Sequence, residues 1–314
     1  MKGADSRPAT KRAPAAKKAS KTKAGANPSS PVLVLGSGLH NAAGTPALDW
    51  PAAVALVFGE KPAPGGEAVA LAWEARLVDQ ASGKGRKKPS VAEKGALEKL
   101  ACMLDGRYSV GTESPLHARL RSGGIADLVV FNFDRSLHDD FDAASWRDER
   151  RAPDLGGTRV WHPHGHTGRP ARIVFGTRRY GMEIKALEAA REDYWKNLGK
   201  KSARLGTDPA PTHWLHTFLS RREVHLIGLG LRPEEWTLWW ALTQRARRFA
   251  RAGEAATPKT VAHVYHDPNQ ADGHDTWRKS ALRSLGVEES RFGPKESKTV
   301  WEQVLNLCEQ GAAR

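Results

Sequence analysis

Three histidines at alternate positions, His162, His164 and His166, form the densest group of reactive side chains in the sequence, within the stretch WHPHGH. On a β-strand this spacing would point all three imidazoles to one face. They could then coordinate a metal ion, or one of them could act as a general base. Pro163 and Gly165 both interrupt strand pairing, and no further convergent ligands are apparent, so a general base is the favoured interpretation.

His164 is the predicted base because a glycine follows it directly. Gly165 would let the chain turn away and leave the imidazole facing a pocket. His162 is then expected on the strand, and His166 is expected past the turn, where it would only line the pocket.

A second polar pair, Asn132 and Asp134, comes at the end of the apolar run in VVFNFD. A side-chain amide at the end of a strand can hold a ribose hydroxyl or a water molecule. The alternative is that such residues only stabilise a turn. The residues alone leave both interpretations open.

Two glycine-rich loops each follow an apolar run and precede a predicted helix. They are GSGLHNAAG, residues 36–44, and GLGLRPEEW, which begins at Gly228. Backbone amides of such loops, together with a helix N-terminus, suit the charge of a pyrophosphate. Neither loop has the GxGxxG pattern, and glycine turns are common after strands, so a tight chain connection is the alternative.

The elements that must position these loops alternate between strand and helix along the chain. This alternation predicts an α/β fold, a Rossmann-like doubly wound parallel sheet with helical insertions. The carboxyl ends of parallel strands meet at one edge, where ligands bind. The four polar or glycine-rich loops are therefore expected to lie together.

Two further patterns concern packing. Ser90 and Glu93 have the spacing of a capping box at the start of a helix. Trp236, Trp239 and Trp240 form a stripe at helical spacing, which is typical of a core or a subunit interface.

Charge and composition predict a basic tail followed by one domain. Residues 1–30 contain eight Lys or Arg and one acid, which is half of the formal net charge of +14, and their low hydrophobicity predicts disorder. Residues 31–314 would form the domain, with a helical insertion at about 60–124. The chain has only two cysteines, which excludes a four-cysteine zinc module and favours a cytoplasmic protein. No apolar run reaches the length of a membrane span, and no secretory signal is expected.

Taken in order, the loops resemble the sirtuin-like (silent information regulator type) NAD-binding superfamily, and more narrowly the zinc-free sirtuin-like domains of bacterial defence NADases. GSGLHNAAGTPALDW is similar to the family's opening Gly-Ala-Gly-x-Ser segment, and VVFNFDRSL to its Thr-x-Asn-Tyr-Asp segment. VWHPHGH carries the family's His-Gly pair, and HLIGLGLRPEEW resembles its late strand and turn. The resemblance covers most of residues 31–245.

The sequence departs from the family at several positions. Ser37 stands where alanine is usual, His40 where serine is usual, Phe131 in place of the glutamine of deacylases, and Arg179 in place of a common aspartate. The zinc-binding cysteines of deacylases are absent. These departures disfavour deacylation and leave NAD binding intact.

What the resemblance implies is cleavage of the nicotinamide–ribose bond of NAD, the substrate, without a metal. The bond breaks through an oxocarbenium-like ribose, as in glycoside hydrolysis. The implied catalytic residues are Asn132 for the ribose or the water, His164 as the base and Asp134 as an orienting group. The implied NAD-binding residues are Gly36, Ser37, Gly38, His40, Gly228, Leu229, Gly230 and Asn269.

The leading hypothesis is therefore an NAD hydrolase (NADase) that acts in antiviral defence, an abortive-infection effector that depletes NAD. One alternative is a non-catalytic sensor that binds NAD or ADP-ribose and regulates a partner. Another is a nucleic-acid-associated protein that acts through its basic tail. Homo-oligomerisation and activation by an operon-encoded or phage-derived partner stay open.

Overall fold

The computed structural model describes residues 30–61, 69–82, 88–108, 114–121, 125–137, 154–155, 158–197, 212, 214–250, 257–266 and 275–313. The predicted disordered tail and the predicted NAD-binding residue Asn269 fall outside the described residues, except for Ser30.

A seven-stranded sheet forms the centre of the described molecule, with strand order β3-β4-β2-β1-β5-β6-β7. The strands are β1 (Val32–Leu35), β2 (Asp127–Val130), β3 (Asp154–Leu155), β4 (Thr158–Trp161), β5 (Val224–Ile227), β6 (Thr260–Tyr265) and β7 (Glu288–Phe292). All neighbours are parallel except the short edge strand β3, which pairs antiparallel with β4. The predicted Rossmann-like α/β fold is thus confirmed.

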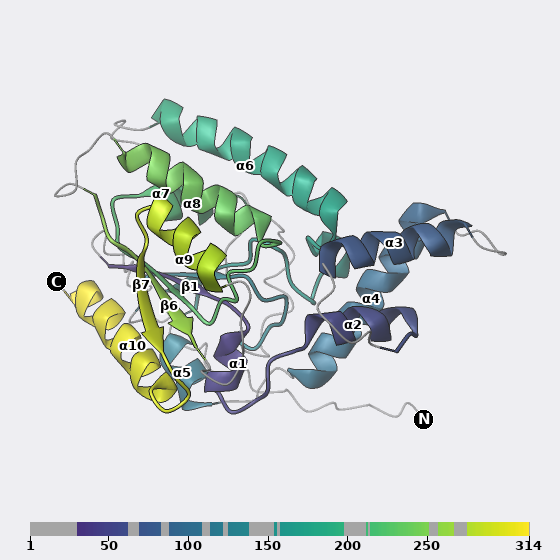
Figure 1. The fold of residues 1–314 in the computed structure, drawn as a ribbon, viewed down its shortest axis with the longest axis horizontal. Helices are drawn as coiled ribbons and strands as arrows, with labels where there is room; N and C mark the ends of the chain where they lie inside the picture. Colours follow the sequence, from purple (N-terminus) through teal and green to yellow (C-terminus); the bar gives the residue numbers. More distant parts are fainter. Residues whose placement is uncertain are drawn as a thin grey trace, which may run out of the picture.

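Helices cover both faces of this sheet, as Figure 1 shows. Helices α6 (Thr177–Asn197), α7 (Trp214–Leu219), α8 (Trp236–Phe249) and α9 (Asp275–Ser284) lie on one face, and α1 (Gly38–Ala42), α5 (Pro115–Arg121) and α10 (Ser297–Ala313) lie on the other. In β1, Val32 and Val34 pack into the first core, whereas Leu33 and Leu35 pack into the second. A strand buried on both faces needs a continuous apolar run, which is why the sequence has VLVL here.

Helices α2 (Trp50–Phe58), α3 (Val69–Ser82) and α4 (Pro89–Arg107) form a separate helical lobe with its own core (Figure 1). Phe133, Ile173 and Phe175, from the loops after β2 and β4, complete that core. The lobe begins earlier than the predicted insertion at about 60–124. It also ends earlier, because Leu120 of α5 packs into the sheet-side core with α10. The lobe therefore sits directly on the carboxyl edge of the sheet.

Glu93 does not form the predicted capping box. Helix α4 begins at Pro89, so Ser90 lies inside its first turn and Lys88 occupies the N-cap position. The Glu93 carboxylate instead accepts hydrogen bonds from Arg178 (2.5 Å) and Arg179 (2.6 Å) at the start of α6. Arg179 also donates to the carbonyl of Ile173 (3.0 Å), so its side chain ties the loop after β4 to the helical lobe.

The loops after β1 and β5 touch backbone to backbone. The amide of Gly38 donates to the carbonyl of Gly228 at 2.8 Å. A Cβ atom on Gly38 would lie 2.5 Å from the Cα of Gly228, and Gly228 itself has a φ of +70°. Only glycine fits this approach, because a side chain would push the two loops apart.

We expect Gly38→Ala to lower the free energy of unfolding by roughly 1–3 kcal/mol, because the added methyl group meets backbone that cannot move aside. Urea denaturation measures the difference. Gly95→Ala is the matched control, since Gly95 lies inside α4 with open space around its Cα and should gain up to about 1 kcal/mol from helix propensity. Equal stability of the two variants would show that the loops are not in close contact.

Candidate functional site

The loops that follow β1, β2, β4 and β5 lie at the carboxyl edge of the sheet, and each contacts the loop of the neighbouring strand. The β1 loop meets the β5 loop through Gly38 and Gly228, and it meets the β2 loop through His40 and Asp134. The β2 loop meets the β4 loop where the amide of Thr167 donates to the carbonyl of Phe133 (2.7 Å). The structure therefore brings together most of the residues predicted to act chemically.

The three histidines of WHPHGH do not share a face. The chain turns at Gly165, whose φ is +75° and whose added Cβ would lie 2.6 Å from the carbonyl oxygen of Arg172. His162 donates from Nδ1 to the carbonyl of Asn132 (3.1 Å), and His166 accepts the amide proton of Gly168 (3.2 Å). Within the described residues, no group of three or more His, Cys, Asp or Glu side chains is placed to hold a metal ion.

His164 is buried among aromatic rings. Its ring lies 4.9 Å from that of Phe131 in an edge-on arrangement and 5.2 Å from that of Tyr180. Nε2 lies 2.6 Å from the hydroxyl oxygen of Thr237, which is fully buried at the start of α8. Burial lowers the pKa of His164 to about 3, so the imidazole is neutral at pH 7.

Asn132 is only 6% exposed, and its side-chain nitrogen has no hydrogen-bond partner among the described residues. An amide donor buried without a partner costs about 1–3 kcal/mol, so native structures rarely keep one without a reason. The turn interpretation does not account for this side chain, because no hydrogen bond joins its oxygen to a neighbouring backbone amide in the described part of the loop.

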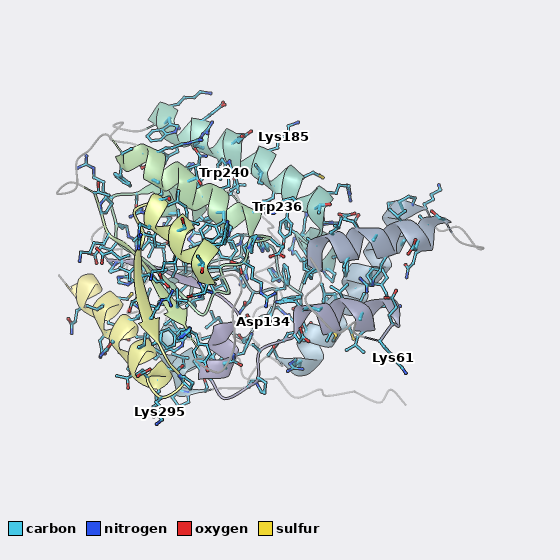
Figure 2. The ribbon with its side chains drawn as sticks, viewed as in Figure 1. Lys61, Asp134, Lys185, Trp236, Trp240 and Lys295 are labelled. Atoms are coloured by element: carbon cyan, nitrogen blue, oxygen red, sulfur yellow. The ribbon has the colours of Figure 1, made fainter. Side chains whose placement is uncertain are left out.

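Asp134 and His40 form a buried pair. His40 donates from Nε2 to the carboxylate at 2.8 Å, and the two side chains are 3% and 4% exposed. The other carboxylate oxygen accepts the amide proton of Ser136 (3.0 Å), an Asx turn. Burial alone would raise the pKa of Asp134, but its bonds to His40 and Ser136 outweigh burial and hold that pKa well below its usual range. Figure 2 shows Asp134 between the sheet and the helical lobe.

His40 also lines a cavity of about 50 Å³ between the β1 loop and helices α4 and α5. The other lining residues are Ala43, Thr45, Arg107, Tyr108, Ser114, His117 and Ser136. Tyr108 stacks on the His40 ring with centroids 3.8 Å apart and planes 14° apart. Seven of these eight side chains carry a polar group, and one of them is the cation Arg107.

The predicted phosphate-binding loops are closed in this conformation. The amides of Gly38, Leu39 and His40 donate to carbonyls within the two loops, and the amide of Gly36 donates to Ile227. On the β5 loop, Leu229 packs against the core below α8, and Gly230 is exposed. Ser37 is the N-cap of the five-residue helix α1, with no hydrogen bond from its side chain to that helix.

The β5 loop contains a strained residue, Leu231, and leads to a carboxyl group with a raised pKa, Glu235. Leu231 has a φ of +50°, a conformation that costs a non-glycine residue about 1 kcal/mol or more and often occurs at functional sites. Burial raises the pKa of Glu235 to about 7, and burial together with Glu235 and Glu234 raises the pKa of Tyr180. No sequence pattern marks Tyr108 or Thr237, and Glu235 lies in GLGLRPEEW without being one of the residues that this pattern selects.

The tryptophan stripe of α8 is partly core. Trp239 and Trp240 pack against the core on the α8 face, whereas Trp236 is 41% exposed beside Tyr180. Figure 2 shows Trp236 and Trp240 along the same helix. The prediction of a core role is thus confirmed for two of the three side chains.

No protein-family model matches the chain, and no curated protein is significantly similar to it in sequence. In the described part of the chain, no helix has both the length and the apolar character that crossing a bilayer requires.

Burial lowers the pKa of six described histidines, and this predicts acid sensitivity. They are His162, His164, His166, His216, His225 and His263. The unfolded chain binds protons at these sites near pH 6.5 while the folded chain does not, so their stabilising contribution is complete above that pH and is lost below it. Glu183 and Glu235, with pKa values raised to about 7, oppose the trend but are fewer.

We therefore expect the free energy of unfolding to fall between pH 7.5 and pH 5.5, measured by urea denaturation at each pH. His164→Gln should reduce the slope of this dependence, since it removes one of the groups. Stability that is equal or higher at pH 5.5 would contradict the burial of these imidazoles.

Proposed function

We propose that the protein is an NAD glycohydrolase that cleaves the nicotinamide–ribose bond and releases nicotinamide and ADP-ribose. The observation that carries this proposal is the unpaired amide of Asn132, 6% exposed, at the carboxyl edge of a Rossmann-like sheet. Nucleotides bind at this edge in such folds. A ribose hydroxyl or a water molecule would satisfy the unpaired donor.

The proposed chemistry needs little from the protein beyond positioning and proton transfer. The C1′–N bond breaks, its electron pair neutralises the pyridinium nitrogen of nicotinamide, and a water molecule adds to C1′ of the resulting oxocarbenium-like ribose. Asn132 would hold the ribose or the water. The glycine loops at Gly36–Gly38 and Gly228–Gly230 would bind the diphosphate and ribose after their amides exchange partners.

His164 fits a role as a neutral hydrogen-bonding group better than its predicted role as a strong base. Its pKa of about 3 leaves it unprotonated across the physiological range, yet makes it a weak proton acceptor. Thr237 fixes the ring through Nε2. We propose that His164 orients the ribose side of the substrate, with Thr237 holding the imidazole ring in place.

In its cellular setting we propose a cytoplasmic, zinc-free defence enzyme that depletes NAD when activated. The closed glycine loops and the small cavity support a resting state that a partner or a second copy of the chain would open. The same closure favours the second candidate function, a module that binds ADP-ribose or NAD and signals without turnover. Nicotinamide release separates the two.

Asn132→Ala should lower the rate of nicotinamide release from NAD at least 100-fold while leaving the free energy of unfolding within about 1 kcal/mol. Stability is preserved because the removed donor makes no hydrogen bond in the free protein. Chromatographic quantification of nicotinamide and urea denaturation provide the two measurements.

Asn306→Ala is the matched control for this substitution. Asn306 is exposed on α10 and hydrogen bonds to Arg119, so its loss should leave activity intact. An Asn132→Ala variant as active as this control would remove Asn132 from the mechanism.

A further inference from the structure

The His40–Asp134 pair is a buried imidazole–carboxylate unit assembled from residues 94 positions apart. His40 lies in α1, the short helix that follows the β1 loop, and Asp134 follows β2, the strand beside β1. The resemblance implies separate roles for the two residues, Asp134 as an orienting group and His40 as a substrate contact, and no motif pairs them.

The carboxylate fixes which nitrogen of His40 carries the proton. Asp134 is ionised, since its pKa lies well below the usual range, and an ionised carboxylate only accepts hydrogen bonds. Nε2 must therefore carry the proton that bridges the 2.8 Å gap. Nδ1 of the neutral ring is then left with its lone pair.

That lone pair has no hydrogen-bond donor in the described part of the chain. The only hydrogen bond of the His40 side chain there is the one to Asp134. The ring lines the cavity, and Tyr108 stacked on its face at 3.8 Å restricts its rotation. The groups that face it from the neighbouring elements are Arg107 of α4, Tyr108 directly after α4, His117 of α5 and Asp134 itself.

His164 and His40 differ in the group that is hydrogen-bonded to the ring. Nε2 of His164 lies against a neutral hydroxyl, and within the described ranges no carboxylate is bonded to that ring to stabilise a positive charge. His40 has a carboxylate on the nitrogen opposite the free lone pair, the arrangement that makes an imidazole an effective general base.

We propose that His40 is the general base of the hydrolysis and that Asp134 positions it; the assignment rests on the proposed NAD glycohydrolase activity. As the C1′–N bond breaks, water forms a bond to C1′, and Nδ1 of His40 takes the proton that this water loses. The electron pair of the broken bond leaves with nicotinamide. The imidazolium is stabilised by Asp134 and then releases its proton to solvent.

The test compares His40→Ala with wild type and with His216→Ala, a control that removes a histidine of α7 bonded to the carbonyl of Ala190. Nicotinamide release gives kcat and KM, and calorimetry gives the Kd of ADP-ribose. We expect kcat to fall 100-fold or more in His40→Ala, the range for loss of a general base. KM and the Kd should stay within threefold, and added imidazole should restore at least a tenth of the lost rate.

Asp134→Asn tests the positioning role with a separate readout. The ¹⁵N spectrum of His40 should show the Nε2–H tautomer in wild type and a mixture in the variant, with a loss in kcat and little change in KM. Unfolding curves of all variants show whether the fold is kept.

Each outcome separates the two claims. If wild type turns over NAD and His40→Ala keeps its kcat, the assignment of His40 is overturned while the proposed function stands. Loss of ADP-ribose binding in parallel with activity would likewise overturn it, because His40 would then be a binding residue. A wild type that releases no nicotinamide overturns the proposed function and the base together.

Discussion

The close approach of the β1 and β5 loops sets the geometry of the whole carboxyl edge. Gly38 and Gly228 meet backbone to backbone at the point where the strand order reverses, between β1 and β5. Two parallel strands in the middle of a doubly wound sheet leave a crevice there only if the loops that follow them turn away in opposite directions. Glycine at these positions lets the loops touch and turn within two residues.

The side chains proposed to act in the chemistry lie within one or two loops of that contact. His40 follows Gly38 by half a turn of α1, and its partner Asp134 comes from the adjacent β2 loop. Phe131 and Phe133 alternate with Asn132 and Asp134 along the chain. The two aromatic rings lie against His164. Asn132 carries the unpaired amide donor, and Asp134 forms the buried pair with His40. The helical lobe covers this edge by packing on Phe133 and Phe175 of the loops, and Tyr108, directly after α4, stacks on the His40 ring.

The sequence predicted much of this arrangement because parallel sheets obey simple rules. Runs such as VLVL could only be strands buried on both faces, and their order implied that the following loops would meet. Gly165 was expected to turn the chain after His164, and its φ of +75° agrees.

Contacts between segments far apart in the chain could not be predicted from local sequence patterns. Thr237 lies in α8 and Tyr108 directly follows α4, and only the tertiary structure places them on His164 and His40. Glu93 had the spacing of a capping residue but found arginine partners in α6, which a local pattern cannot foresee. His40 was selected only as a substrate contact, because its carboxylate partner is 94 residues away.

The most direct measurement is a time course of the full chain with NAD, in which all products are separated and identified. We expect nicotinamide and ADP-ribose to appear in equal amounts as NAD disappears, with or without an activator added to open the loops. Tight binding of NAD with no nicotinamide released under any of these conditions would contradict an enzyme and leave a binding module in its place.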